Sequence, residues 1–95
     1  AISLDRQYSD ALYGLSVLYV FELNEAERAI PYLQRLLAKE SKNTDALFLL
    51  ARAYVEEGNI SAAVNSYDRI IEVASSEEAR REAQRNREIL VGGSE

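Results

Sequence analysis

Residues that could carry out catalysis are scarce in this sequence. The 95 residues include no histidine and no cysteine, which excludes imidazole acid–base catalysis, thiol nucleophiles and thiolate metal sites. Adjacent carboxylates occur at Glu56–Glu57 and Glu77–Glu78, but neighbours on a helix point in different directions and cannot share a proton. No glycine-rich loop that could hold a phosphate is present. We therefore expect no catalytic residues, no cofactor and no enzymatic activity.

The other charged residues favour a solvated surface over a metal or anion site. Asp68 and Glu72 lie four residues apart, a spacing typical of one exposed helix face, whereas hard cations bind several oxygens that converge from a loop. We therefore expect no metal site. Arginines and glutamates are interleaved near the end of the chain, at Arg80, Arg81, Glu82, Arg85, Arg87 and Glu88. We expect a solvated helix face here, and contact with an acidic partner is the alternative.

Apolar residues between Thr44 and Glu77 are spaced as in two amphipathic helices. The first stripe has the helical spacing i, i+3, i+4, i+7 and consists of Leu47, Leu50, Ala51 and Tyr54. The second stripe consists of Ala63, Val64, Tyr67, Ile70 and Ile71. Gly58–Asn59 lies between them and suits a helix C-cap followed by an N-cap. Because the turn is so short, the two helices must pack antiparallel as a hairpin.

A second copy of both stripes lies upstream. Moved back by 35 residues, the first stripe falls on Leu12, Leu15, Ser16 and Tyr19. Moved back by 34 residues, the second stripe falls on Ala29, Ile30, Leu33, Leu36 and Leu37. The one-residue difference falls near Leu23–Asn24, in a turn, where an insertion costs least. Repetition at this period is typical of a helical solenoid and disfavours a single generic hairpin.

These stripes resemble the tetratricopeptide repeat (TPR), whose pattern is W-x2-L-G-x2-Y, then A-x3-F, then P. The resemblance covers about residues 10–77, with Ser16 and Ala51 in place of the usual glycine and Ser41 and Ser75 in place of the common proline. It implies an all-α fold, a right-handed α-α superhelix of two TPR helical hairpins plus a C-terminal capping helix. The implied parts are repeat 1 (about 10–43), repeat 2 (about 44–77), the capping helix (about 77–90) and a flexible tail (91–95).

The turn signals predict where each helix begins and ends. We expect helices over residues 5–22, over 25–39, from Asn43 or Thr44 to Glu57, from Asn59 to Ala74, and over 77–90. Ser9–Asp10 is an alternative start of the first helix, since either side chain can cap it. The expected N-terminal caps are Asn24 with Glu27, Asn43 or Thr44, Asn59, and Ser75 with Glu78. Pro31 should kink the second helix without ending it.

Two features of the outer helices carry further expectations. Gly14 lies inside the first helix at a cost of about 1 kcal/mol relative to alanine, and we expect another helix to pack closely there, with a hinge as the alternative. The last helix has a thin apolar stripe of Ala79, Ala83, Ile89 and Leu90. We expect it to dock onto the fourth helix and to present a polar outer face.

The resemblance implies that the first helix of each repeat lines an inner groove. The positions beside the core stripe are Asp10, Tyr13, Val17 and Val20 in repeat 1, and Asp45, Phe48, Arg52 and Val55 in repeat 2. Apolar residues at exposed positions usually mark a contact surface. The predicted peptide-binding residues are Tyr13, Val17, Val20, Phe48, Arg52 and Val55. In this hypothesis Arg52 orients an acidic or carbonyl group of the peptide, and the alternative is that the last helix or a further repeat covers this face.

The expected function is therefore a non-catalytic protein–protein interaction module that binds a peptide segment in its groove. The alternative is an assembly element that stacks on further repeats or self-associates within a larger scaffold protein.

The net charge of −5 disfavours nucleic acid as a partner, and no apolar run approaches the roughly 18 residues of a membrane-spanning helix. The chain begins with alanine and lacks methionine, so we expect a fragment or processed product. We expect it to be soluble, with the cytoplasm as the expected compartment.

Overall fold

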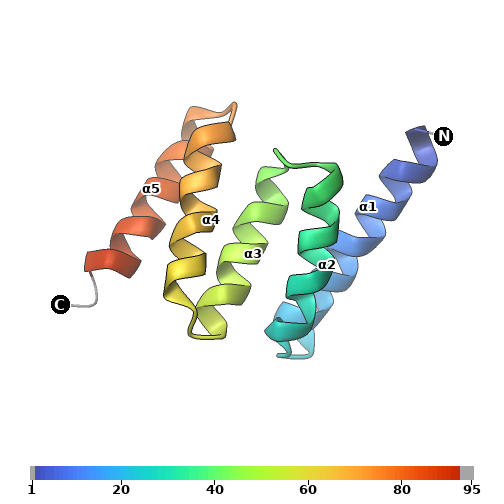
Figure 1. The fold of residues 1–95 in the computed structure, drawn as a ribbon, viewed down its shortest axis with the longest axis horizontal. Helices are drawn as coiled ribbons and strands as arrows, with labels where there is room; N and C mark the ends of the chain where they lie inside the picture. The colour runs from blue at the N-terminus through green and yellow to red at the C-terminus, as the bar shows by residue number, and fades with distance from the viewer. Residues whose placement is uncertain (1, 93–95) are drawn as a thin grey trace.

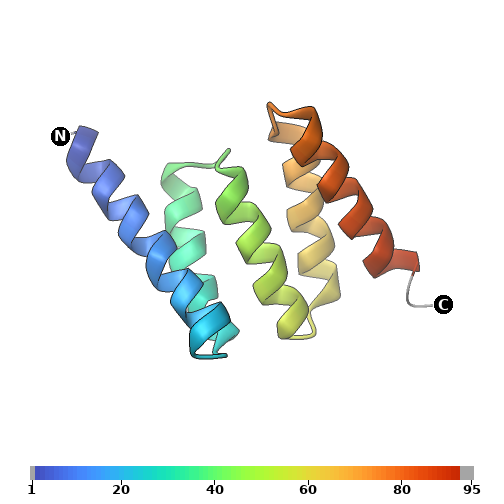
Figure 2. The same ribbon diagram turned by 180° about the vertical axis from the view of Figure 1, so that it is seen from behind.

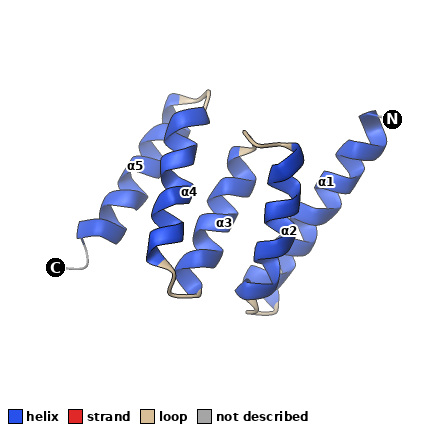
Figure 3. Ribbon diagram, viewed as in Figure 1, coloured by secondary structure: helices blue, strands red, loops and turns tan. Residues whose placement is uncertain are grey.

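The computed structural model describes residues 2–92, and side chains from residue 6 onward. Within these residues the chain forms α1 (Ile2–Val17), a π-helical segment η1 (Leu18–Glu22), α2 (Ala26–Lys39), α3 (Thr44–Glu56), α4 (Ile60–Val73) and α5 (Glu77–Gly92). Figure 3 shows that only short loops join these helices and that the described part contains no strand. The prediction of an all-α fold is confirmed.

The helices pack in chain order and form two layers. Each helix contacts the next one along the chain, and the N- and C-terminal helices lie at opposite ends of a molecule 48 Å long. Helices α2 and α4 lie on the face nearer the viewer in Figure 1. Figure 2 shows α1, α3 and α5 on the opposite face, which we call the inner face. Two hairpins and a fifth helix thus stack side by side.

Asparagine side chains begin the two helices of the second hairpin. The side-chain oxygen of Asn43 accepts a hydrogen bond from the Ala46 amide at 3.1 Å, and that of Asn59 accepts one from the Ala62 amide at 3.2 Å. Each oxygen satisfies a helical N–H that lacks an intrahelical partner. Gly58 has φ +78°, a left-handed conformation that glycine adopts at no steric cost. These caps confirm the predicted turn.

Two other predicted caps are wrong. Asn24 does not cap α2: it has φ +57°, and the cap position belongs to Glu25, which makes no capping hydrogen bond. Asn24 instead makes the left-handed turn between η1, which ends at Glu22, and α2, a conformation that asparagine tolerates better than most residues. Helix α5 is capped by Ser76, whose hydroxyl accepts from the Ala79 amide at 3.2 Å, one residue later than predicted.

The remaining boundaries lie close to those expected. Helix α2 continues through Pro31, as predicted. Helix α5 extends to Gly92, so the first two residues of the expected flexible tail are helical, and residues 93–95 lie outside the described part. No helix packs on Gly14, and a Cβ added there would meet nothing within 4 Å. That expectation was wrong because Gly14 lies on the exposed side of α1, away from α2.

Two clusters of buried apolar side chains hold the stack together. The first joins α1, η1, α2 and α3, and the second joins α3, α4 and α5. Leu37 packs against both clusters. Positions 34 residues apart in α2 and α4 are buried alike, in the pairs Ala29 and Ala63, Leu33 and Tyr67, and Leu36 and Ile70. The repeat in the sequence therefore corresponds to a repeat in packing.

Candidate functional site

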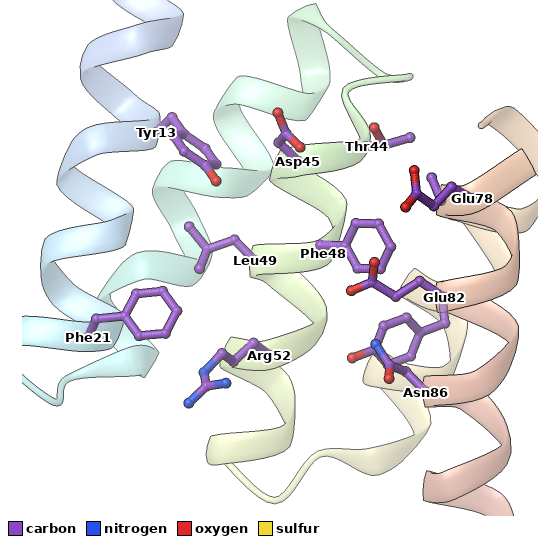
Figure 4. Close-up of a pocket in the computed structure, with 12 residues that line it drawn as sticks. Tyr13, Phe21, Thr44, Asp45, Phe48, Leu49, Arg52, Glu78, Glu82 and Asn86 are labelled. Carbon is purple, nitrogen blue, oxygen red and sulfur yellow. The ribbon is translucent and has the colours of Figure 1, made fainter. Parts of the chain in front are cut away.

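A hollow of about 510 Å³ lies on the inner face, over α3 and between α1 and α5. Figure 4 shows side chains from these helices converging on α3 from both sides. The residues that line the hollow are Tyr13, Phe21, Thr44, Asp45, Phe48, Leu49, Arg52, Tyr67, Glu78, Ala79, Glu82 and Asn86. A second hollow of about 370 Å³ adjoins it and shares Arg52, Tyr67 and Asn86 with it. We call the two hollows together the inner groove.

Four of the six sequence-predicted peptide-binding residues lie in this groove. Tyr13, Phe48 and Arg52 line the larger hollow, and Val55 lines the smaller one. Tyr13 comes from α1 and the other three come from α3. The helical spacing thus identified the side chains that α1 and α3 present on the inner face.

The other two predicted residues lie elsewhere. Val20 has only 2% of its surface exposed and belongs to the first core cluster, so its assignment to the groove is corrected. Val17 packs partly against the same cluster and lines neither hollow. For Val20 the cause is η1: a π-helix bonds each N–H to the carbonyl five residues back, as Leu23 does to Leu18 at 2.9 Å. Each residue there rotates less about the axis than in an α-helix, so Val20 turns into the core.

The same rotation brings Phe21 into the groove. Phe21 lines the larger hollow and has 53% of its surface exposed. Its ring lies 4.8 Å from the Arg52 guanidinium carbon, within the range of a cation–π contact. Sequence reasoning missed Phe21 because a 3.6-residue period, continued from Tyr13, places it away from the groove. No feature of the nearby sequence predicted the π-helical turn.

Arg52 is already partnered within the chain. Besides its contact with Phe21, its Nε donates to a Glu56 carboxylate oxygen at 3.1 Å, four residues along α3. Its side chain is 57% exposed, so this pair contributes little to stability. The two contacts hold the guanidinium where the two hollows meet, and Figure 4 shows Arg52 beside Phe21.

Aromatic rings form the apolar wall of the groove. Phe48 contacts Tyr67 edge to face, with ring centroids 6.2 Å apart, and both belong to or pack against the second core cluster. Burial raises the pKa of Tyr67, and the nearby charge of Glu82 acts in the same direction, while a hydrogen bond from Asn86 and the charge of Arg52 oppose it. Burial, followed by the negative charge of Asp45, raises the pKa of Tyr13. Both phenols therefore stay neutral at physiological pH.

Helix α5 forms the side of the groove opposite α1, which the sequence did not predict. Glu78, Glu82 and Asn86 recur every four residues and line the larger hollow. We had expected α5 to be a capping helix with a solvated face. Its inner side instead continues the surface of α1 and α3, because it packs against α4 as α3 packs against α2.

The groove offers surface for binding and no evident reactive centre. Among residues 2–92 no group of three or more acidic, histidine or cysteine side chains is placed to hold a metal ion. None of the helices described is both long enough and apolar enough to cross a membrane. The side chains that meet in the groove are aromatic, apolar, carboxylate and guanidinium groups. Groups of these kinds also occur together at protein–protein interfaces, where they contribute buried apolar area and charge complementarity.

Comparison with known protein families gives the same architecture. The tetratricopeptide repeat model matches residues 20–86, from η1 to the middle of α5. The chain belongs to the tetratricopeptide repeat family. Searches among curated proteins and among solved structures found no match. TPR domains generally mediate protein–protein interactions, and the family is generally non-catalytic.

Proposed function

We propose that this TPR domain binds a peptide segment of another protein in its inner groove. The observation that carries the proposal is the hollow of about 510 Å³ lined by rings from three elements, Tyr13 of α1, Phe21 of η1 and Phe48 of α3. Rings of this kind offer large contact areas with few rotatable bonds, and they often dominate binding energy when a partner desolvates them. The groove is open along the inner face, which suits an extended or helical segment.

The test selects peptides from a random library displayed on phage, with the domain immobilised. Enriched peptides are then titrated against wild type and against the Phe21→Ala and Phe48→Ala variants. We expect each variant to lose about 1–3 kcal/mol of affinity, because each removes an aromatic anchor. Phe21 is largely exposed, so its variant should fold normally even if Phe48→Ala weakens the second core cluster.

The matched control is Ile60→Ala, which removes an exposed apolar side chain at the start of α4, outside the groove. It should bind the peptides as wild type does. Peptides that bind Phe21→Ala and Phe48→Ala undiminished would show that their site lies elsewhere and would contradict the proposal.

A second candidate function, assembly through α1, is favoured by a comparison of equivalent positions. Ala46, Leu49 and Ala53 of α3 are buried, in a cluster that includes α2. Their counterparts 35 residues earlier, Ala11, Gly14 and Leu18, are exposed. The side of α1 that corresponds to the α2-contacting side of α3 is therefore uncovered. A helix equivalent to α2, from a further repeat or a second copy, would fit there.

A further inference from the structure

The charged groups of the inner groove are mostly carboxylates. Asp45, Glu78 and Glu82 line the larger hollow together with one cation, Arg52. Glu56 adds a further carboxylate in the smaller hollow. Of the three carboxylates of the larger hollow, Asp45 comes from α3, which also carries Phe48, and Glu78 and Glu82 come from α5, as Figure 4 shows. A segment lying in the groove would therefore meet negative charge from α3 beneath it and from α5 at its side.

Within the described residues, these three carboxylates are left without an ion pair. The ion pairs of this part of the chain involve other acids, and Arg52 itself pairs with Glu56. Arg81 and Arg85 lie next to Glu78 and Glu82 on α5 and line a separate surface hollow with them. Neither arginine forms an ion pair with either glutamate. The negative charge that faces the groove is thus screened by solvent and by these two arginines, but it is not neutralised by a direct contact.

The carboxylates also lie beside aromatic surface. The charge of Asp45 acts on the Tyr13 phenol, and that of Glu82 acts on the Tyr67 phenol. A lysine or arginine side chain could lay its methylene groups or its cation on these rings while its charge meets the carboxylate. An acidic side chain would be repelled by three unpaired carboxylates, and the one cation of the groove, Arg52, already shares its charge with Glu56.

On the basis of the groove proposed above as the binding site, we infer that its occupant is a peptide segment with a lysine or arginine next to an apolar or aromatic residue. The basic side chain lies between Tyr13 and Phe48, within reach of Asp45 and Glu82. The apolar neighbour covers the rings toward Phe21. This replaces the sequence-based hypothesis of an acidic or carbonyl group held by Arg52, since Arg52 is partnered by Glu56 and Phe21.

Glu82 should contribute most to this preference. Asp45 and Glu78 lie in the first turns of α3 and α5, where the positive end of the helix dipole offsets part of their charge. Glu82 lies one turn further into α5 and has no such compensation. Its carboxylate extends toward the centre of the hollow in Figure 4. The Glu82→Gln variant removes this charge while keeping the shape of the side chain.

The test uses the phage-selected peptides and a charge series made from the best of them. In this series each basic residue is replaced in turn by glutamine and by glutamate. We expect enrichment of lysine or arginine beside apolar residues, and progressively weaker binding of the glutamine and glutamate forms. Glu82→Gln should weaken the basic peptide about two- to fivefold, as expected for an exposed ion pair. Raising the sodium chloride concentration should weaken wild type more than this variant.

The matched control is Glu88→Gln, which removes a carboxylate from α5 at a position that lines a different surface hollow, outside the groove. It should leave binding unchanged. Enriched peptides that are neutral or acidic, yet are lost on Phe21→Ala, would overturn the charge preference and leave groove binding standing. Peptides that bind Phe21→Ala and Phe48→Ala as well as wild type would overturn both. If Glu82→Gln and Glu88→Gln lost the same affinity for the basic peptide, the effect would come from the net charge of the domain and not from the groove. That result would also overturn the inference.

Discussion

Small side chains at particular positions allow neighbouring helices to approach closely. Ala51 and Ala63 are completely buried, in the two helices that form the second hairpin. Ser16, at a position where the family often has glycine, is also completely buried. Its hydroxyl donates to the Leu12 carbonyl at 2.7 Å, which satisfies the hydroxyl within its own helix. Ser16 can therefore occupy a tightly packed position without an unpaired polar group.

The first prediction concerns Ala63. Ala63→Leu should lower the free energy of unfolding by about 1–3 kcal/mol, because a completely buried alanine leaves no room for three further carbon atoms. Urea denaturation followed by circular dichroism measures the change. Ala38→Leu, at an exposed alanine of α2, is the matched control and should lose much less. A loss below about 0.5 kcal/mol for Ala63→Leu, a size typical of exposed sites, would mean that Ala63 does not lie at a tight helix contact.

At the scale of the element, α5 shows how a highly charged helix can dock. Its completely buried apolar residue is Ala83, with Ala79 and Leu90 partly buried against the second core cluster, whereas Ile89 of the predicted stripe is 63% exposed. Two of its arginines contribute instead. Arg80 donates to the carbonyls of Ile71 and Ala74 at 3.3 and 2.8 Å, and Arg87 pairs with Asp68 of α4. These arginines belong to the contact with α4, not to a purely solvated face.

The second prediction concerns this contact. Arg80→Ala should lower the free energy of unfolding by about 1 kcal/mol, because it leaves carbonyls at the end of α4 without their charged donor. The Arg80 side chain is 38% exposed, so water can replace part of the lost hydrogen bonding and the loss of unfolding free energy stays moderate. Thermal or urea unfolding measures it. Arg81→Ala, an exposed neighbour, should change stability by a few tenths of a kcal/mol, and an equal loss in both variants would contradict a specific role for Arg80.

At the scale of the whole molecule, the two ends of the stack differ in character. The outer side of α5 carries charged residues such as Glu77, Arg81 and Arg85. At the other end, Tyr8 of α1 and Leu18 of η1 are each 41% accessible, and α5 itself exposes Ile89 and Val91, which are 63% and 48% accessible. Solenoids bury apolar surface between neighbouring repeats and end in polar faces. Apolar side chains are thus exposed at both ends of the stack, and the charged surface of α5 sets that end apart from the α1 end.

The third prediction separates the two candidate functions at this scale. If the exposed side of α1 mediates assembly with a second copy, the mass measured by size-exclusion chromatography with light scattering should rise with concentration. Leu18→Glu should then restore the monomer, because a charge in an apolar contact is costly to desolvate. A monomer at every concentration tested, for wild type and variant alike, would contradict assembly between copies.

Local features of the sequence determined the helices, the second hairpin turn and most of the core. Apolar spacing and asparagine caps act within a few residues, so they can be recognised without knowing the fold. This is why Asn43 and Asn59 were identified as caps, and why Tyr13, Phe48 and Arg52 were placed on one surface. The repeat at 34–35 residues extended the same local information to the order of the stack.

The folded structure decided which further residues complete the groove. A π-helical turn changed the rotation of η1, which buried Val20 and presented Phe21 beside Arg52. The packing of α5 on α4 brought Glu82 to the same hollow as Tyr13, although the two are far apart in the chain. The π-helical turn follows no sequence pattern that we could recognise. The apolar periodicity of α5 specifies which of its faces is buried, but it leaves open which residues of other helices lie opposite its remaining faces. The acidic character of the groove comes from carboxylates of α3 and α5 together, and it exists only once these helices are stacked.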